Sequence, residues 1–107
     1  MHSTLIVARM EAQSRDAVAD LFAEFDRTDM PNLMGTRRRQ LFHYRGLYFH
    51  LQDFDDENGG EKIEGTKSHP LFVKISDDLK QFITAYDPAW KSPKDAMADR
   101  FYHWRAA

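Results

Sequence analysis

The chain has 107 residues, 42% of them hydrophobic and 30% charged, which is typical of one globular domain over residues 1–107 rather than a disordered segment. Its formal net charge of −2 lacks the basic excess of a nucleic-acid binder, and the absence of cysteine excludes disulfides and thiolate metal sites. Its apolar segments are too short for a signal peptide or a membrane span, so we expect a cytoplasmic protein that contacts no membrane.

The first part of the chain predicts a strand followed by a helix. Thr4–Met10 is a continuous apolar run rich in β-branched residues, which predicts a strand covered on both faces and central in its sheet. Ser14 is a candidate N-cap for the helix, and apolar residues then recur with helical spacing at Val18, Leu21, Phe22 and Phe25. The helix is expected to end near Asp26, because residues 29–32 are rich in helix breakers, and an irregular connection leads on to Gly35.

Residues 36–53 predict a β-hairpin with Arg45 and Gly46 in its turn. Along the second strand, Leu47, Phe49 and Leu51 point to one face, which Phe42 and Tyr44 share. Tyr48, His50 and Gln52 point to the other face. In this register Leu41 lies opposite His50 and Arg39 is its diagonal neighbour, unless a bulge shifts the pairing.

The second part of the chain predicts a polar loop, a helix and a last strand. Residues 53–67 are polar and contain Gly59 and Gly60. A helix is expected from Pro70 to Tyr86, with Asp87-Pro88 ending it. Its apolar stripe comprises Phe72, Ile75, Leu79, Phe82, Ile83 and Tyr86. After a connector, Arg100–Arg105 is expected to form the final strand.

The resulting order, β-α-β-β-α-β, predicts a ferredoxin-like α+β fold. Right-handed crossovers place two helices on one face of a four-stranded antiparallel sheet, with the strands in the spatial order 4-1-3-2. The strand that contains Arg39 then lies at an edge. The opposite sheet face must be polar or covered, and a second subunit is a common cover.

Three residues are candidates for chemistry, because the chain has no nucleotide-binding, zinc-protease or EF-hand motif and its histidines lack metal-ligand spacing. His50 is placed to exchange a proton near neutral pH, or it is an ordinary surface-face histidine. Arg39 offers a fork of donors for an enolate or carboxylate, or it protects a strand edge. Asp26 is a solvated helix end, or a cation such as Arg39 or His50 holds it there. His69 is interpreted first as a capping residue before Pro70.

Four short blocks give the chain its resemblance to a known family. In order they are G-T-R-R-R-Q-L-F at Gly35–Phe42, L-Y-F-H-L at Leu47–Leu51, S-H-P-L-F at Ser68–Phe72 and F-Y-H-W at Phe101–Trp104. Together with Asp26-Arg27-Thr28 and Pro31, they resemble the small aromatic polyketide cyclases of the tetracenomycin F2 cyclase type over nearly the whole chain.

This resemblance implies a single polyketide cyclase domain of the dimeric α+β barrel type that forms a homodimer. It implies an intramolecular aldol condensation with dehydration of a polyketide intermediate, without a metal or organic cofactor. By this resemblance, the arginine, histidine and aspartate proposed as catalytic in the family correspond to Arg39, His50 and Asp26. We expect the substrate pocket to be lined by Phe25, Tyr48, Leu41, His69 and Trp104.

One position departs from the family pattern, and two other functions remain open. The best-known member has a histidine immediately before the aspartate, where this chain has Phe25. Either that histidine is not essential to a shared mechanism, or this protein uses another mechanism or another ring. The alternatives are a cofactor-independent monooxygenase of aromatic polyketides, and a non-catalytic polyketide-binding subunit associated with a polyketide synthase complex.

Overall fold

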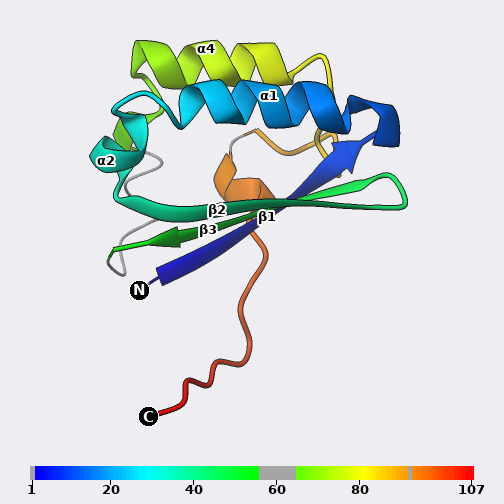
Figure 1. Cartoon of the computed structure of the whole chain (residues 1–107). Helices are drawn as coiled ribbons and strands as arrows, with labels where there is room; N and C mark the ends of the chain where they lie inside the picture. The colour runs from blue at the N-terminus through cyan, green and yellow to red at the C-terminus, as the bar shows by residue number, and fades with distance from the viewer. Residues whose placement is uncertain (1, 56–64, 92) are drawn as a thin grey trace.

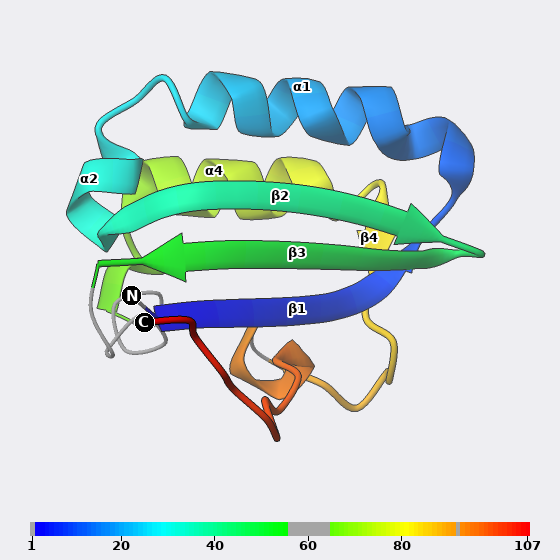
Figure 2. The same cartoon turned by 60° about the horizontal axis from the view of Figure 1, so that its bottom comes forward.

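The computed structural model describes residues 2–55, 65–91 and 93–107, and it consists of a curled antiparallel sheet with helices on one face (Figure 1, Figure 2). The predicted ferredoxin-like α+β fold is confirmed. Most of the predicted polar loop, at residues 56–64, lies outside the described residues.

The sheet contains β1 (His2–Met10), β2 (Thr36–Tyr44), β3 (Leu47–Phe54) and β4 (Ile83–Thr84). Its order is β2-β3-β1-β4, and every pairing is antiparallel. This confirms the predicted order of the first three strands, the central position of β1 and the edge position of β2, but the fourth place is taken by Ile83–Thr84 and not by the predicted Arg100–Arg105. β1 therefore pairs with a strand on each side, as its apolar and β-branched residues predicted.

The hairpin register is the predicted one. Leu41 pairs with His50 and Arg39 with Gln52, and the one bulge lies between Thr36 and Arg38, beyond this part of the hairpin. The two turn residues both have positive φ, 45° at Arg45 and 82° at Gly46. A two-residue turn of this hand matches the right-handed twist of the strands, which explains why the register is so regular next to it.

The first helical segment confirms one prediction and corrects another. After the short 3-10 helix η1 (Ala12–Ser14), α1 (Arg15–Phe25) buries Val18, Phe22 and Phe25 as expected. The connection that follows is not irregular, because α2 (Met30–Met34) forms there. Pro31 is tolerated in its first turn, both terminal methionines are buried, and Gly35 ends the helix at a φ of 74°.

The second long helix is shorter than predicted. It forms α4 (Pro70–Leu79), and the chain then turns and pairs Ile83 and Thr84 with Met10 and Arg9 as β4. The apolar stripe continues past Leu79 because Phe82 and Ile83 still pack against the core from the turn and the strand. Spacing alone therefore could not show where the helix ended.

The prediction of a final strand at Arg100–Arg105 is wrong. These residues form no regular structure, and Phe101 is 98% exposed. The edge of β1 that does not pair with β3 is already occupied. β4 pairs with one end of this edge. Met97 and Ala98, just after the 3-10 helix η2 (Pro93–Ala96), pair with Ile6 and Leu5 farther along it. The chain leaves the sheet beyond this point and extends away from it (Figure 1).

The sheet face opposite the helices, here called the outer face, has an apolar centre, with Arg38, Asp53 and Gln40 toward one end. Cross-strand pairing aligns Val7, Phe49 and Phe42 across three strands, and Leu5 pairs with Leu51 beside them. None of these side chains is fully buried, and Phe42 is 50% exposed. The outer face therefore leaves apolar surface uncovered in a single chain.

Candidate active site

A cavity of about 250 Å³ lies between the sheet and the helices. Its walls are mostly apolar and come from α1, α2, α4 and all four strands. The lining residues are Ile6, Ala8, Phe22, Phe25, Met34, Arg39, Tyr48, His50, Gln52, Phe72, Ile75, Ser76, Leu79, Lys80 and Ile83. An apolar enclosure with a few polar groups on one wall is typical of a small-molecule site.

The polar groups come from the hairpin, whose more polar face is turned toward the helices. Tyr48, His50 and Gln52 alternate along β3, so all three point into the cavity, and each is buried. The apolar residues of the same strand face outward. Burying the polar face of an amphipathic strand is unfavourable unless its groups are hydrogen-bonded, so this arrangement marks the site.

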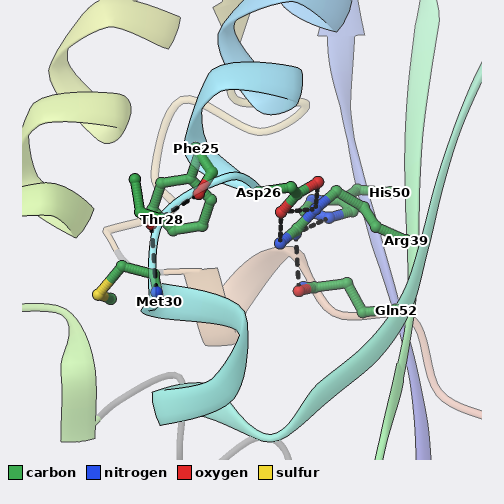
Figure 3. Close-up of polar contacts among 7 residues, drawn as sticks. All are labelled: Phe25, Asp26, Thr28, Met30, Arg39, His50 and Gln52. Atoms are coloured by element: carbon green, nitrogen blue, oxygen red, sulfur yellow. Dashed lines mark hydrogen bonds and ion pairs between the residues drawn. The ribbon is translucent and has the colours of Figure 1, made fainter.

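Asp26 reaches the site from the end of α1. The turn after the helix is held by Thr28, whose Oγ1 donates to the Phe25 carbonyl at 2.7 Å and accepts from the Met30 N–H at 3.2 Å (Figure 3). This small network fixes the direction in which the Asp26 carboxylate projects. Its Oδ1 accepts from Arg39 Nη2 at 2.8 Å, so the predicted cationic partner of Asp26 is Arg39.

Arg39 connects three polar residues of the site, Asp26, His50 and Gln52. Its Nε also donates to Asp26, at 3.0 and 3.1 Å, while Nη1 donates to His50 Nε2 at 2.8 Å and to Gln52 Oε1 at 2.9 Å (Figure 3). The guanidinium lies 5.0 Å from the centre of the Phe22 ring, and its side chain is only 7% exposed. Of its five N–H bonds, one on Nη2 has no acceptor in the described part of the chain.

His50 is held as a neutral imidazole. A guanidinium has no lone pair to accept a hydrogen bond, so Nε2 of His50 must be the acceptor and the ring proton must be on Nδ1. Burial, together with the Arg39 positive charge, lowers the pKa of His50 from 6.5 to about 3. The Phe22 ring packs edge-on against the imidazole with centroids 5.0 Å apart.

Tyr48 completes the polar row. Burial raises the pKa of its phenol, against the opposing effect of the Arg39 charge, so the hydroxyl stays protonated. Its ring lies 6.2 Å from that of His50. The hydroxyl has no hydrogen-bond partner among the residues that the structure describes, and it therefore remains free to bind a ligand in the cavity.

The structure brings most, but not all, of the predicted site residues together. Asp26, Arg39 and His50 form one network, and Phe25 and Tyr48 line the cavity beside it. The other three predicted pocket residues do not line it. They are Leu41, His69 and Trp104.

Each of these three residues has another position in the fold. Leu41 packs against the core from the edge strand, opposite His50. His69 caps α4, its Nδ1 accepting from the Leu71 N–H at 3.1 Å, as its first interpretation expected. Trp104 lies in the extended C-terminal segment and is 73% exposed.

Gln52 is the site residue that sequence reasoning missed. It was placed on the correct face by strand alternation but was given no role. The sequence pattern pointed to it, because Gln52 is two positions from His50 and directly opposite Arg39, so its side chain lies beside both of theirs.

Across residues 2–55, 65–91 and 93–107, no group of three or more His, Asp or Glu side chains is arranged to hold a metal ion. Over the same ranges, no helix is both long and apolar enough to cross a bilayer.

Comparison with known proteins identifies the family. The model of the polyketide synthesis cyclase family matches residues 2–105. The chain belongs to this family. An uncharacterized protein of Streptomyces coelicolor is 45% identical, over 97% of this chain and 95% of that protein. Tetracenomycin F2 cyclase of Streptomyces glaucescens is 39% identical, over 98% of this chain and 95% of the relative.

Structural comparison agrees with this family assignment. The solved structure of tetracenomycin F2 cyclase from Streptomyces glaucescens, a type II polyketide cyclase, superposes with a TM-score of 0.93 over the whole of both chains. A putative antibiotic biosynthesis monooxygenase from Nitrosomonas europaea has a TM-score of 0.55 over 76% of this chain and 77% of its own. At 8% identity, that likeness concerns the fold alone.

Proposed function

We propose that this polyketide cyclase family member closes a ring of an aromatic polyketide by intramolecular aldol condensation followed by loss of water. The observation that carries the proposal is the buried network of Arg39, His50 and Gln52 on one wall of a mostly apolar cavity, with the Asp26 carboxylate, 37% exposed, holding Arg39 from outside it. Such a cavity can fold a reactive chain and bring one carbonyl to the polar wall.

In the first step, a substrate carbonyl oxygen replaces His50 as an acceptor of an Arg39 N–H. The guanidinium then stabilises the enolate that forms when a proton leaves the neighbouring carbon. The freed Nε2 of His50 takes that proton, and the enolate carbon attacks a second carbonyl in the same molecule. Asp26 acts as a positioning residue, because it holds the guanidinium in place.

In the second step, His50 first returns its proton to the new alkoxide, which becomes a hydroxyl. His50 then takes a second proton from the carbon beside the hydroxyl-bearing carbon and delivers it to that hydroxyl, which leaves as water, while the electron pair of the broken C–H bond forms the carbon–carbon double bond that makes the ring aromatic. The reaction is redox-neutral, so it needs neither an oxidant nor an organic cofactor. Phe25 and Tyr48 contribute apolar wall and a hydrogen-bond donor to substrate binding.

The partner and the location are part of the same proposal. The apolar centre of the outer face supports a homodimer in which two sheets cover each other. A cyclase of this kind acts on the product of a polyketide synthase, in the cytoplasm, either free or associated with that complex.

Product analysis tests the proposal. The purified chain is added to a reconstituted aromatic polyketide synthase, and products are compared by mass spectrometry and NMR with and without it. A new cyclised product lighter than its precursor by one water is expected. Oxygen consumption with a product heavier by oxygen would instead identify a monooxygenase.

A second comparison separates catalysis from passive binding. Arg39→Ala and His50→Ala variants are tested in the same reconstituted pathway, after confirming that both fold. If both restored the native product at the normal rate, the chain would be a non-catalytic binding subunit. Slower formation of the product in both variants is the result expected for an enzyme.

A further inference from the structure

Gln52 is oriented by Arg39. It is 2% exposed, lines the cavity, and presents Oε1 to Arg39 Nη1 at 2.9 Å. Because a guanidinium only donates, the atom that faces Arg39 must be the carbonyl oxygen of the amide. The Nε2 amino group of Gln52 is therefore turned away from Arg39, with its orientation fixed before any ligand arrives.

The amino group of Gln52 has no acceptor in the described part of the chain. Its neighbour on one side is Arg39, which is only a donor, and its neighbour on the other side is Thr4 of β1. The Thr4 Oγ1 is buried and also has no hydrogen-bond partner among the described residues. An unpaired donor on the wall of a cavity favours a ligand that supplies an oxygen.

We propose that the Gln52 amide donates a hydrogen bond to a carbonyl or hydroxyl oxygen of the substrate and so selects which carbon is held at Arg39 and His50. This inference rests on the proposed function, and it names Gln52 as a specificity-determining residue. Tyr48 offers a second donor, four residues away on the same face of the strand. At the usual rise of a β-strand, the Cα atoms of Tyr48 and Gln52 are about 13 Å apart. The pair fits an extended polyketide oxygenated at both ends.

A pair of substitutions separates donation to substrate from support of Arg39. Gln52→Glu keeps an oxygen for Arg39 but has no N–H to donate, whereas Gln52→Leu loses both. Gln81→Glu is the matched control, because Gln81 is exposed after α4 and does not line the cavity. If Gln52 binds substrate, Gln52→Glu and Gln52→Leu each raise KM about tenfold and increase wrongly cyclised products, while Gln81→Glu changes neither.

Two outcomes of this experiment would overturn the inference. A Gln52→Glu enzyme with wild-type KM and product pattern would show that Gln52 only supports Arg39. Wild-type behaviour of Gln52→Leu would show that it does neither. Thermal unfolding of each variant separates misfolding from loss of binding.

A binding measurement keeps the inference independent of turnover. Dihydroxyanthraquinone, a non-reactive fused-ring diphenol, is titrated into the ¹⁵N-labelled wild-type protein. The side-chain amide signals of Gln52 are expected to shift together with the backbone amide signal of Tyr48. Shifts at Tyr48 without shifts at Gln52, or no binding, would contradict the inference. If these shifts occur but no polyketide is cyclised, the proposed function fails and the Gln52 site stands.

Discussion

The Nη1 of Arg39 lies 2.8 Å from the Nε2 of His50, so these two site residues bind each other before they meet a substrate. The contact assigns the imidazole proton to Nδ1. ¹⁵N NMR of the ligand-free protein should therefore show His50 as the neutral Nδ1–H tautomer between about pH 4 and about pH 8. Titration of His50 near 6.5, or a proton on Nε2, would contradict this geometry.

The lowered pKa of His50 predicts a pH-dependent stability. The unfolded chain takes up a proton at His50 below its ordinary pKa of 6.5, whereas the folded protein does so only near 3. The free energy of unfolding should therefore fall as pH drops through this window, by about 1.4 kcal/mol per pH unit from this group. Above pH 6.5 both states are neutral at His50, and no contribution is expected.

A His50→Gln variant isolates this contribution, because glutamine can still accept from Arg39 but does not titrate. Urea unfolding of both proteins at about pH 7.5 and about pH 4.5 should show a smaller loss of stability in the variant. Equal losses in the two proteins would mean that His50 is protonated in the folded state.

Arg39→Lys should impair activity strongly, even though the substitution keeps the positive charge. A lysine ammonium cannot reach Asp26, His50 and Gln52 together, since it is a compact group without the planar fork of a guanidinium. We expect kcat/KM for cyclisation to fall about 100-fold. Arg37→Lys is the control, because Arg37 pairs with Asp55 at the exposed bulge, and it should retain wild-type activity.

The hairpin turn offers a stabilising substitution. Arg45 has a φ of 45°, which costs most L-residues energy but is well tolerated by asparagine, and Gly46 follows it at 82°. Arg45→Asn should raise the free energy of unfolding by roughly 0.5–1 kcal/mol, whereas Gly46→Ala should lower it by about 1 kcal/mol. Arg45→Ala removes the side chain without easing φ, so it should show no gain in denaturant unfolding.

The proposed homodimer can be tested on the outer face. Phe42 is half exposed there and is aligned with Phe49 and Val7. Phe42→Asp should shift the protein from dimer to monomer in analytical ultracentrifugation, because a charge would be buried between two apolar sheets. Val73→Asp, at an exposed position on α4, should leave the dimer intact. A wild-type protein that sediments as a monomer would exclude this use of the outer face.

The hairpin was predictable from sequence because its determinants are local. Strand alternation and a two-residue turn are set by neighbouring residues, and together they placed Arg39, Leu41 and His50 correctly. The strand pattern did not predict which face of the hairpin would be turned toward the helices. Apolar residues normally point to the covered face, and here the polar face of β3 does so, because the cavity supplies hydrogen-bond partners for it.

The wrong final strand and the unpredicted β4 both lie in the C-terminal third, where structure depends on competition for one sheet edge. Both Ile83-Thr84 and Phe101–Trp104 have the composition of a strand, but only one segment can pair beside Arg9 and Met10. The turn after Leu79 brings Ile83 there first. The aromatic residues of Phe101–Trp104 do not show that Ile83 and Thr84 already pair with Met10 and Arg9.

Asp26 is the last residue before the chain leaves α1, and Arg39 belongs to β2, so their ion pair joins the helical layer to the sheet on either side of the cavity. The groups proposed for chemistry therefore also set how far apart the two walls stand. Lengthening or shortening this link, as in Asp26→Glu, would change the room available to a flat ring along with its reactivity. In this chain, a change at Asp26 would therefore alter the width of the cavity and the position of the Arg39 guanidinium together.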